Sequence, residues 1–121
     1  DQVKENIKTV SNAPATSLNK KEIELIDKVT NIYNEKVKVP CTGCEYCLPC
    51  QKNVSIPDIF ELYNNLYVFG TEEISKNTYR SYIEKEKDAS LCIECGKCEI
   101  TCPQNIKIRE HLKDAHETLT K

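Results

Sequence analysis

The chain has 121 residues, which is the size of a single domain and too short for a full-sized enzyme barrel. Its formal net charge of −2 offers no basic field to nucleic acid, and no apolar run approaches the roughly 18–20 residues of a membrane span. We therefore expect neither nucleic acid nor a membrane as a partner. The sequence contains no methionine, and we expect it to be a piece of a longer protein.

The first third of the chain predicts two helices. Residues 1–10 place Val3, Ile7 and Val10 on one stripe, and a loop of small and polar residues follows at 11–17. The second helix is expected over residues 20–34. Asn19 is its N-cap, with Glu22 placed three residues later to complete a capping box. We expect its apolar stripe to pack against the rest of the domain. The stripe consists of Ile26, Val29, Ile32 and Tyr33.

Three further helices are expected, and no strand. The first runs from Pro57 to Phe69, with Gly70 as its stop, and the second covers residues 71–83. The last helix is amphipathic, with its apolar face formed by Ile108, Leu112, Ala115 and Leu119. No segment alternates long enough to indicate a strand, so the fold class is mostly α.

The chain also contains an internal repeat. Residues 50–56 align without gaps on residues 102–108. In the same register, Phe60 meets Leu112, Tyr63 meets Ala115 and Tyr67 meets Leu119. Each unit is a cysteine loop, a short connector and an amphipathic helix. Two such units predict two equivalent sites related by a pseudo-twofold axis.

The second of two cysteine groups matches a bacterial ferredoxin run. Its pattern is Cys92-x2-Cys95-x2-Cys98-x3-Cys102-Pro103, which binds a [4Fe–4S] cluster. Three thiolates at two-residue gaps let one tight loop wrap a cubane, and the fourth, followed by proline, leaves the loop. Gly96 suits a close approach of the backbone to the cluster.

The first group, Cys41-x2-Cys44-x2-Cys47-x2-Cys50, departs from that run at its end. The last gap is two residues long, and Gln51 replaces the expected proline. Beside its twin, this group predicts a second [4Fe–4S] cluster. Because Cys-x2-Cys pairs also build four-cysteine zinc sites, a zinc module remains an alternative for all eight cysteines.

We expect the fourth cysteine of each group to serve the other group's cluster, as in two-cluster ferredoxins. The first cluster is then held by Cys41, Cys44, Cys47 and Cys102, and the second by Cys92, Cys95, Cys98 and Cys50. The shortened gap before Cys50 leaves open that this cysteine stays with its own loop.

These motifs resemble the C-terminal region of iron–sulfur-containing aldo/keto reductases of anaerobic bacteria and archaea. The resemblance is carried by residues 2–7 (QVKENI), 41–50 (CTGCEYCLPC), Ile56-Pro57, Tyr63-Asn64, 89–98 (ASLCIECGKC) and Cys102-Pro103-Gln104. Glu45 stands where that family often has glycine. The domain itself resembles the α-helical ferredoxins, such as the cluster domain of succinate dehydrogenase iron–sulfur subunits.

The resemblance implies an NADPH-linked barrel upstream in the same polypeptide, whose catalytic Tyr, Lys, Asp and His would precede Asp1. Residues 1–16 would then be a helix and linker from the end of that barrel, and residues 17–121 an α-helical ferredoxin-like domain binding two clusters. By this resemblance the chain is the non-catalytic part of an oxidoreductase.

Two histidines and one tyrosine are further candidates for ligands or shields of a metal site. His111 and His116 are five residues apart on one helix, so we expect exposed or half-exposed surface residues and not metal ligands. Tyr46 lies inside a cysteine loop and is expected to shield a cluster. Cysteines at two-residue gaps are typical of cofactor sites in intracellular proteins, and we expect the cytoplasm as the compartment.

The expected function is therefore one-electron transfer by two [4Fe–4S] clusters. The alternative, from a different class, is a structural role in which the clusters only staple a small core.

Overall fold

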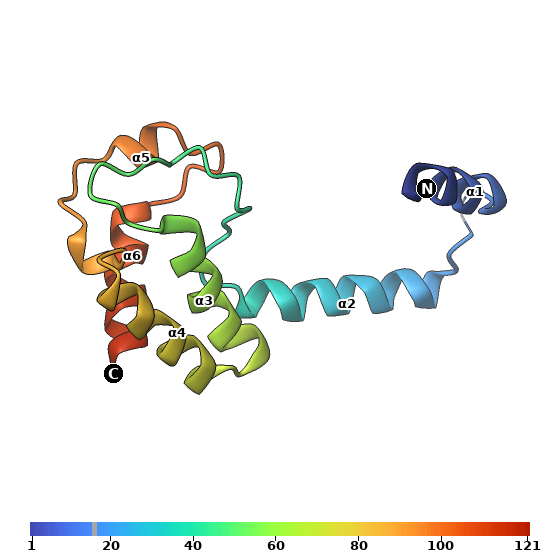
Figure 1. The fold of residues 1–121 in the computed structure, drawn as a ribbon. Coiled ribbons are helices and arrows are strands. Elements are labelled where there is room, and N and C mark those ends of the chain that lie inside the picture. Colours follow the sequence, from blue (N-terminus) through green and yellow to red (C-terminus); the bar gives the residue numbers. More distant parts are fainter. Residues whose placement is uncertain (16) are drawn as a thin grey trace. The chain divides into compact units, whose positions relative to one another are not determined.

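The computed structural model describes residues 1–15 and 17–121 and is helical (Figure 1). The described residues contain no strand, as predicted. They divide into two compact units, residues 1–34 and residues 35–121. The elements are α1 (Gln2–Asn12), α2 (Lys20–Lys36), α3 (Ile56–Phe69), α4 (Glu72–Glu84), the 3-10 helix η1 (Ala89–Leu91), α5 (Lys97–Ile100) and α6 (Ile108–Thr120).

The start of α2 confirms the predicted capping box. The side-chain Oδ1 of Asn19 accepts hydrogen bonds from the backbone N–H groups of Lys21 and Glu22, at 3.0 and 3.2 Å. Glu22 Oε2 in turn accepts the backbone N–H of Asn19 at 2.8 Å. Three N–H groups at this end that lack helical partners are thereby satisfied.

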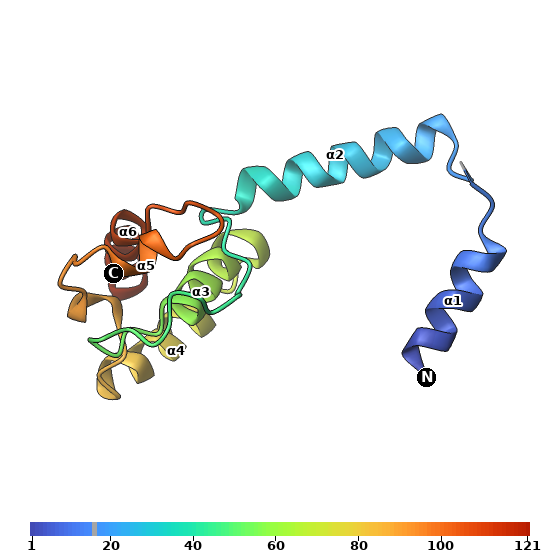
Figure 2. The same ribbon diagram turned by 90° about the horizontal axis from the view of Figure 1, so that it is seen from above.

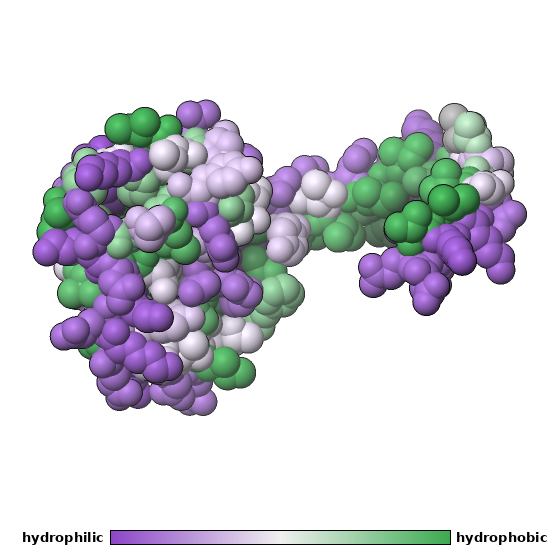
Figure 3. Space-filling view, turned by 45° about the horizontal axis from the view of Figure 1, so that its top comes forward, coloured by the Kyte–Doolittle hydropathy of each residue, from purple (hydrophilic) through white to green (hydrophobic). Residues whose placement is uncertain are grey.

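The apolar stripe of α2 is not covered by the described residues. Val29 is 57% exposed and Ile26 is 50% exposed, and neither α1 nor α2 contributes a buried residue. Figure 3 shows hydrophobic side chains gathered along these helices. The expectation that this stripe is covered is not met within residues 1–34, because periodicity identifies a face but not what packs on it. The domain boundary predicted after residue 16 falls on a residue outside the described ones and stays a prediction.

The core of residues 35–121 lies between α3, α4 and α6, whose arrangement is visible in Figures 1 and 2. All four predicted apolar residues of α6 are buried, and α3 ends at Gly70, which adopts a left-handed φ of 68°. Each fully buried large apolar side chain contributes about 1.5–3 kcal/mol. The largest of them are Tyr79, Phe60, Ile56, Ile59, Ile108, Leu112 and Leu119.

The repeat is visible in this core. Phe60 and Leu112 are both buried, as are Tyr63 and Ala115. The third pair differs, since Leu119 is buried but Tyr67 is 36% exposed. Nζ of Lys38 lies over the Tyr67 ring, 4.5 Å from its centroid, in a cation–π contact. Tyr67 therefore packs at the surface beside the first cysteine loop and not in the core.

Among the described residues, no helix has the length and apolar character needed to cross a membrane.

Candidate metal centre

The two cysteine loops share one backbone design. In each, the second residue after the first cysteine and the residue after the second cysteine have positive φ. These angles are 66° at Gly43 and 63° at Glu45 in the first loop, and 55° at Glu94 and 73° at Gly96 in the second. Only glycine adopts this conformation without steric cost. Each loop has one glycine, but at opposite positions of the pair, so Glu45 takes the conformation that Gly96 takes in the second loop.

The connectors after the fourth cysteines also repeat. Asn53 and Asn105 both have positive φ, at 59° and 51°. Each donates its backbone N–H to the carbonyl of the preceding fourth cysteine, at 2.9 Å to Cys50 and 3.1 Å to Cys102. This turn leads each chain segment into its helix, α3 or α6. The alignment found in the sequence is thus matched in the backbone at the turn that each asparagine makes.

A first cavity is bordered by thiols from both loops. Cys41, Cys44 and Cys47 of the first loop line it together with Cys102. Its volume is only about 20 Å³. The feature that suits a metal cluster is therefore the set of four thiols and not the size of the cavity. Its other walls are largely apolar, and Glu45 is the one charged residue among those that line it. The buried apolar residues of its wall are Ile56, Phe60, Ile106 and Ile108.

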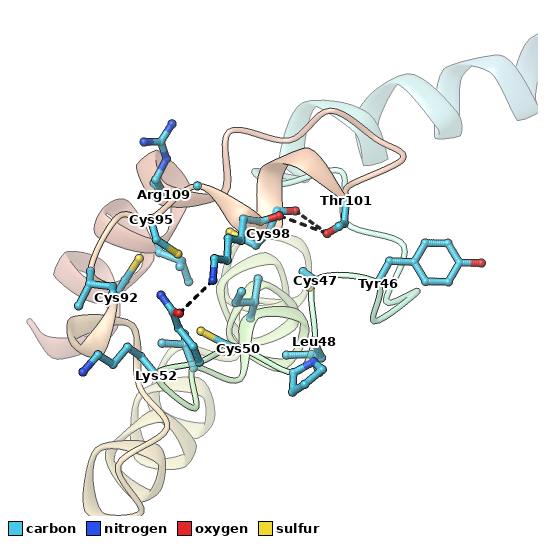
Figure 4. A pocket seen from close by; sticks show the side chains of 18 residues that line it. Tyr46, Cys47, Leu48, Cys50, Lys52, Cys92, Cys95, Cys98, Thr101 and Arg109 are labelled. Carbon is cyan, nitrogen blue, oxygen red and sulfur yellow. Dashed lines mark hydrogen bonds between the residues drawn. The ribbon is translucent and has the colours of Figure 1, made fainter.

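A second cavity is larger, about 400 Å³, and it too combines both loops. Cys92, Cys95 and Cys98 line it with Cys50 of the first loop, and Cys47 borders it as well. Figure 4 shows Cys50 facing the three cysteines of the second loop across this space. The charged residues that line it are all basic, namely Lys52, Lys97 and Arg109.

Burial alters the acidity of the inner thiols. It raises the pKa of Cys47 to about 11, and it also raises the pKa of Cys41 and of Cys98. In the cluster-free protein these thiols are therefore protonated at neutral pH. Because metal ligands must be thiolates, binding of a cluster releases protons.

The start of the first loop is fixed by the side-chain amide of Asn64 on α3. Asn64 Oδ1 accepts the backbone N–H groups of Lys38 at 3.0 Å and Val39 at 2.9 Å. Its Nδ2 donates to the carbonyl of Val39 at 2.8 Å. Val39 itself is fully buried two residues before Cys41. One asparagine thus satisfies three backbone groups at the entrance to the loop.

The start of the second loop is fixed by a different group, the hydroxyl of Tyr79 on α4. The backbone N–H of Ala89 donates to this hydroxyl at 3.0 Å, and Nδ1 of His116 lies 2.8 Å from it. The buried carboxylate of Asp88 caps η1 by accepting the N–H of Ser90 at 2.9 Å. These contacts hold η1 directly before Cys92.

Arg109 braces the same loop against α6. Its guanidinium pairs with Glu99 at 2.8 Å and donates to the carbonyl of Glu94 at 3.4 Å, while Glu99 also accepts the backbone N–H of Arg109. These bonds to Arg109 hold the pKa of the Glu99 carboxyl below its usual range. A hydrogen bond and ion pair with Lys113 does the same to the pKa of Glu94. Gly96 lies against the Arg109 side chain, and a Cβ placed there would lie 3.7 Å from its Cζ.

The two histidines are half-exposed, as expected, but the bond from His116 to Tyr79 was not predicted. Tyr46 is among the residues that line the second cavity, but it is 67% exposed and in Figure 4 its ring points away from that space, so the structure does not support a shielding role of the ring there. Asn64, Tyr79 and Arg109 were missed as supporting residues. Their partners lie 10 to 37 residues away in the sequence, and no local pattern marks such contacts.

Among the described residues, no three His, Cys, Asp or Glu side chains are placed to hold one metal ion. Structural zinc sites gather four ligands at about 2.0–2.3 Å from one ion. Four thiols bordering a common space suit a cluster of several irons, each iron taking one cysteine.

Comparison with known protein families matches residues 40–106, more than half of the chain, to the 4Fe-4S dicluster domain. No curated protein and no solved structure was found to match. The matched segment begins beside the first cysteine and ends in the connector after the last one, so it contains all eight thiols. The chain therefore belongs to the 4Fe-4S dicluster family, which implies iron–sulfur clusters and electron transfer.

Proposed function

We propose that residues 35–121 hold two [4Fe–4S] clusters and pass single electrons between them. The first cluster is bound by Cys41, Cys44, Cys47 and Cys102, and the second by Cys92, Cys95, Cys98 and Cys50. The observation that carries this proposal is that each cavity is lined by the first three cysteines of one loop and the fourth cysteine of the other, with Cys47 also bordering the second cavity.

The crossed assignment draws further support from the position of Cys102. Burial is the main cause that raises the pKa of Cys41, and the nearness of Cys44 and of Cys102 adds to it. Cys50 lines the second cavity but not the first. The shorter gap before Cys50 is therefore compatible with service to the other loop's cluster.

When bound, each cubane supplies a centre that takes up and releases one electron. The protein's own groups hold and enclose it. Buried apolar residues such as Ile56, Phe60 and Ile108 keep water from the first site, and the αL residues of each loop turn its backbone around the cysteine sulfurs.

Anaerobic reconstitution tests this function. We expect about equal amounts of iron and acid-labile sulfide, enough for two cubanes per chain, and an EPR signal that appears with dithionite and disappears on reoxidation. Zinc without sulfide would replace the proposal with a zinc module. Intact clusters that stay silent over the whole accessible range of potentials would establish the structural alternative.

That structural alternative has one observation in its favour. The core of residues 35–121 contains no Trp or Met, and its only buried Phe is Phe60. A small core of this kind gains much from a cofactor that ties its two halves together.

We further propose that the chain is the C-terminal part of a cytoplasmic aldo/keto reductase family oxidoreductase from an anaerobe, with an NADPH-binding barrel upstream. The support is the motif resemblance at residues 2–7, 41–50 and 89–98. The coding sequence ahead of Asp1 tests it directly, and a barrel with catalytic Tyr, Lys, Asp and His is expected there. The isolated chain, incubated with NADPH and aldehydes, should give no turnover.

A further inference from the structure

The two cavities differ in electrostatic character although the loops around them repeat. Lys52, Lys97 and Arg109 line the second cavity, and none of its lining residues is acidic. Among the residues that line the first cavity, Glu45 is the only charged one. The two cavities are adjacent, since Cys47 lines both. The net charge of their lining residues nevertheless differs by several units.

Some of this charge is already compensated. Arg109 is paired with Glu99 at 2.8 Å, so its field at the second cavity is largely cancelled. Lys113 is likewise paired with Glu94 at 2.8 Å. Lys52 and Lys97 form no ion pair within the described part of the chain. They are the uncompensated charges of the second cavity.

Lys97 is also held in place. It begins α5 between Cys95 and Cys98, and its Nζ donates to Oε1 of Gln51 at 3.3 Å. Gln51 directly follows Cys50, so this bond joins the two loops beside the second cavity (Figure 4). A neutral amide holds the ammonium there without cancelling its charge. Lys52, which follows Gln51, adds a second positive charge to the lining of the same cavity.

We propose that Lys52 and Lys97 make the second cavity the electron-accepting member of the pair, so that an electron passes from the first cavity to the second. This rests on the proposed function, since both cavities must hold their clusters. The step is balanced within the chain, because the centre bound at the first cavity is oxidised by one electron and that at the second is reduced by one. Positive charge stabilises the added electron at the second cavity, and Glu45 with apolar walls disfavours it at the first.

The size of the effect follows from Coulomb's law. A unit charge about 10 Å away, at an effective dielectric constant of about 20, changes an equilibrium by about tenfold, and exposure to water reduces this. Removing both lysine charges should therefore weaken reduction at the second cavity by about tenfold. For a one-electron couple, tenfold corresponds to about 59 mV.

The test is an EPR-monitored redox titration of the reconstituted protein carrying both Lys52→Gln and Lys97→Gln. Wild type should titrate in two one-electron steps. In the double variant, the higher-potential step should move down by about tenfold in its equilibrium constant, while the lower step moves much less. A matched variant with Lys52→Arg and Lys97→Arg keeps the charges and should keep both wild-type potentials. Glu45→Gln should raise the lower step and leave the higher one in place.

Raising the salt concentration offers an independent readout, since screening should narrow the gap between the two steps in wild type and change it less in the double Gln variant. The inference is overturned if the double Gln variant moves the lower step as much as the higher one, or moves neither step, while both remain reducible. Wild-type protein that shows no reducible cluster at all would instead overturn the proposed function.

Discussion

The two cysteine loops have the same backbone but different surroundings. Left-handed residues occupy matching positions in both, and both connectors turn at an asparagine. Both cavities have buried apolar residues in their walls, but the only charged residue that lines the first is Glu45, whereas the second is larger and adds Lys52, Lys97 and Arg109. A repeated backbone can thus specify the same kind of site twice while the side chains around it give each copy its own electrostatic environment.

The largest effect should come from removing the clusters. Without them we expect both loops to lose their structure, so that the difference between them disappears. We expect chelation or oxygen exposure to unfold much of residues 35–121, because cluster binding and folding are linked. Under crossed ligation each cluster joins the two halves, so backbone amides of both loops should lose protection together in hydrogen exchange. Circular dichroism of holo and apo protein measures the overall loss. An apo form that keeps the full helical signal and melts at the same temperature would contradict this.

The next largest effect separates the loops. Cys102→Ser should remove about half of the iron and eliminate the lower-potential step, because that cysteine is proposed to serve the first loop's cluster. Cys50→Ser should remove about half of the iron and eliminate the higher-potential step. Iron analysis and redox titration of the matched pair measure both effects. The opposite pattern would mean that each fourth cysteine serves its own loop.

Asn64→Leu tests the anchor of the first loop. It leaves two backbone N–H groups and one carbonyl around Val39 without their partner. A buried group left unsatisfied costs about 1–3 kcal/mol, so we expect a loss of at least about 2 kcal/mol and a drop in Tm of roughly 10 °C. The neighbouring Asn65→Leu is the control and should change Tm much less. Equal losses from the two variants would argue against the anchor.

Tyr79→Phe tests the anchor of the second loop and removes fewer bonds. The backbone N–H of Ala89 and Nδ1 of His116 lose their partner, for a cost of about 1–2 kcal/mol. Tyr82→Phe, on a half-buried ring of the same helix, is the matched control.

This anchor also has a predicted dependence on pH. Burial raises the pKa of Tyr79 to about 12, above the value of about 10 in an unfolded chain. The neutral hydroxyl therefore stabilises the fold fully below pH 10, and this contribution is lost as pH rises through about 12. The difference in Tm between wild type and Tyr79→Phe should be constant below pH 10 and then shrink. A difference that grows at alkaline pH would contradict the assignment.

The smallest effects concern the exchanged glycines. Glu45→Gly relieves a left-handed conformation at a φ of 63° and should stabilise the protein by up to about 1 kcal/mol. Glu45→Gln removes only the charge and is the control. Gly96→Ala, at a φ of 73°, should cost about 1 kcal/mol. Thermal melts of the three variants sharpen the comparison, since opposite signs are expected at equivalent positions of the two loops.

Local sequence signals predicted the local structure well. The capping box at Asn19, the end of α3 before Gly70 and the buried face of α6 all depend on neighbours within a few residues. The short helix α5 was not predicted, because its four residues are too few to show a helical repeat of apolar residues. The stripes of α2 and α6 look alike in sequence, yet only that of α6 is buried among the described residues. Which face is covered depends on what the chain folds against, and periodicity carries no information about that.

The candidate ligands were likewise evident from cysteine spacing, but the side chains that support the loops were not. Asn64 and Tyr79 act on backbone groups 10 to 26 residues away, through hydrogen bonds that require the folded helices. From sequence, an isolated asparagine on a helix predicts only an exposed position, and a tyrosine on an apolar face predicts only a core position.

The amide of Asn64 has a mechanical consequence. It grips the chain at Lys38 and Val39 through three hydrogen bonds, immediately before Cys41. A force applied to the chain before Lys38 would act on these hydrogen bonds, and through them on α3, before it acts on Cys41. The backbone that leads into Cys41 is thereby tied to α3 on its upstream side.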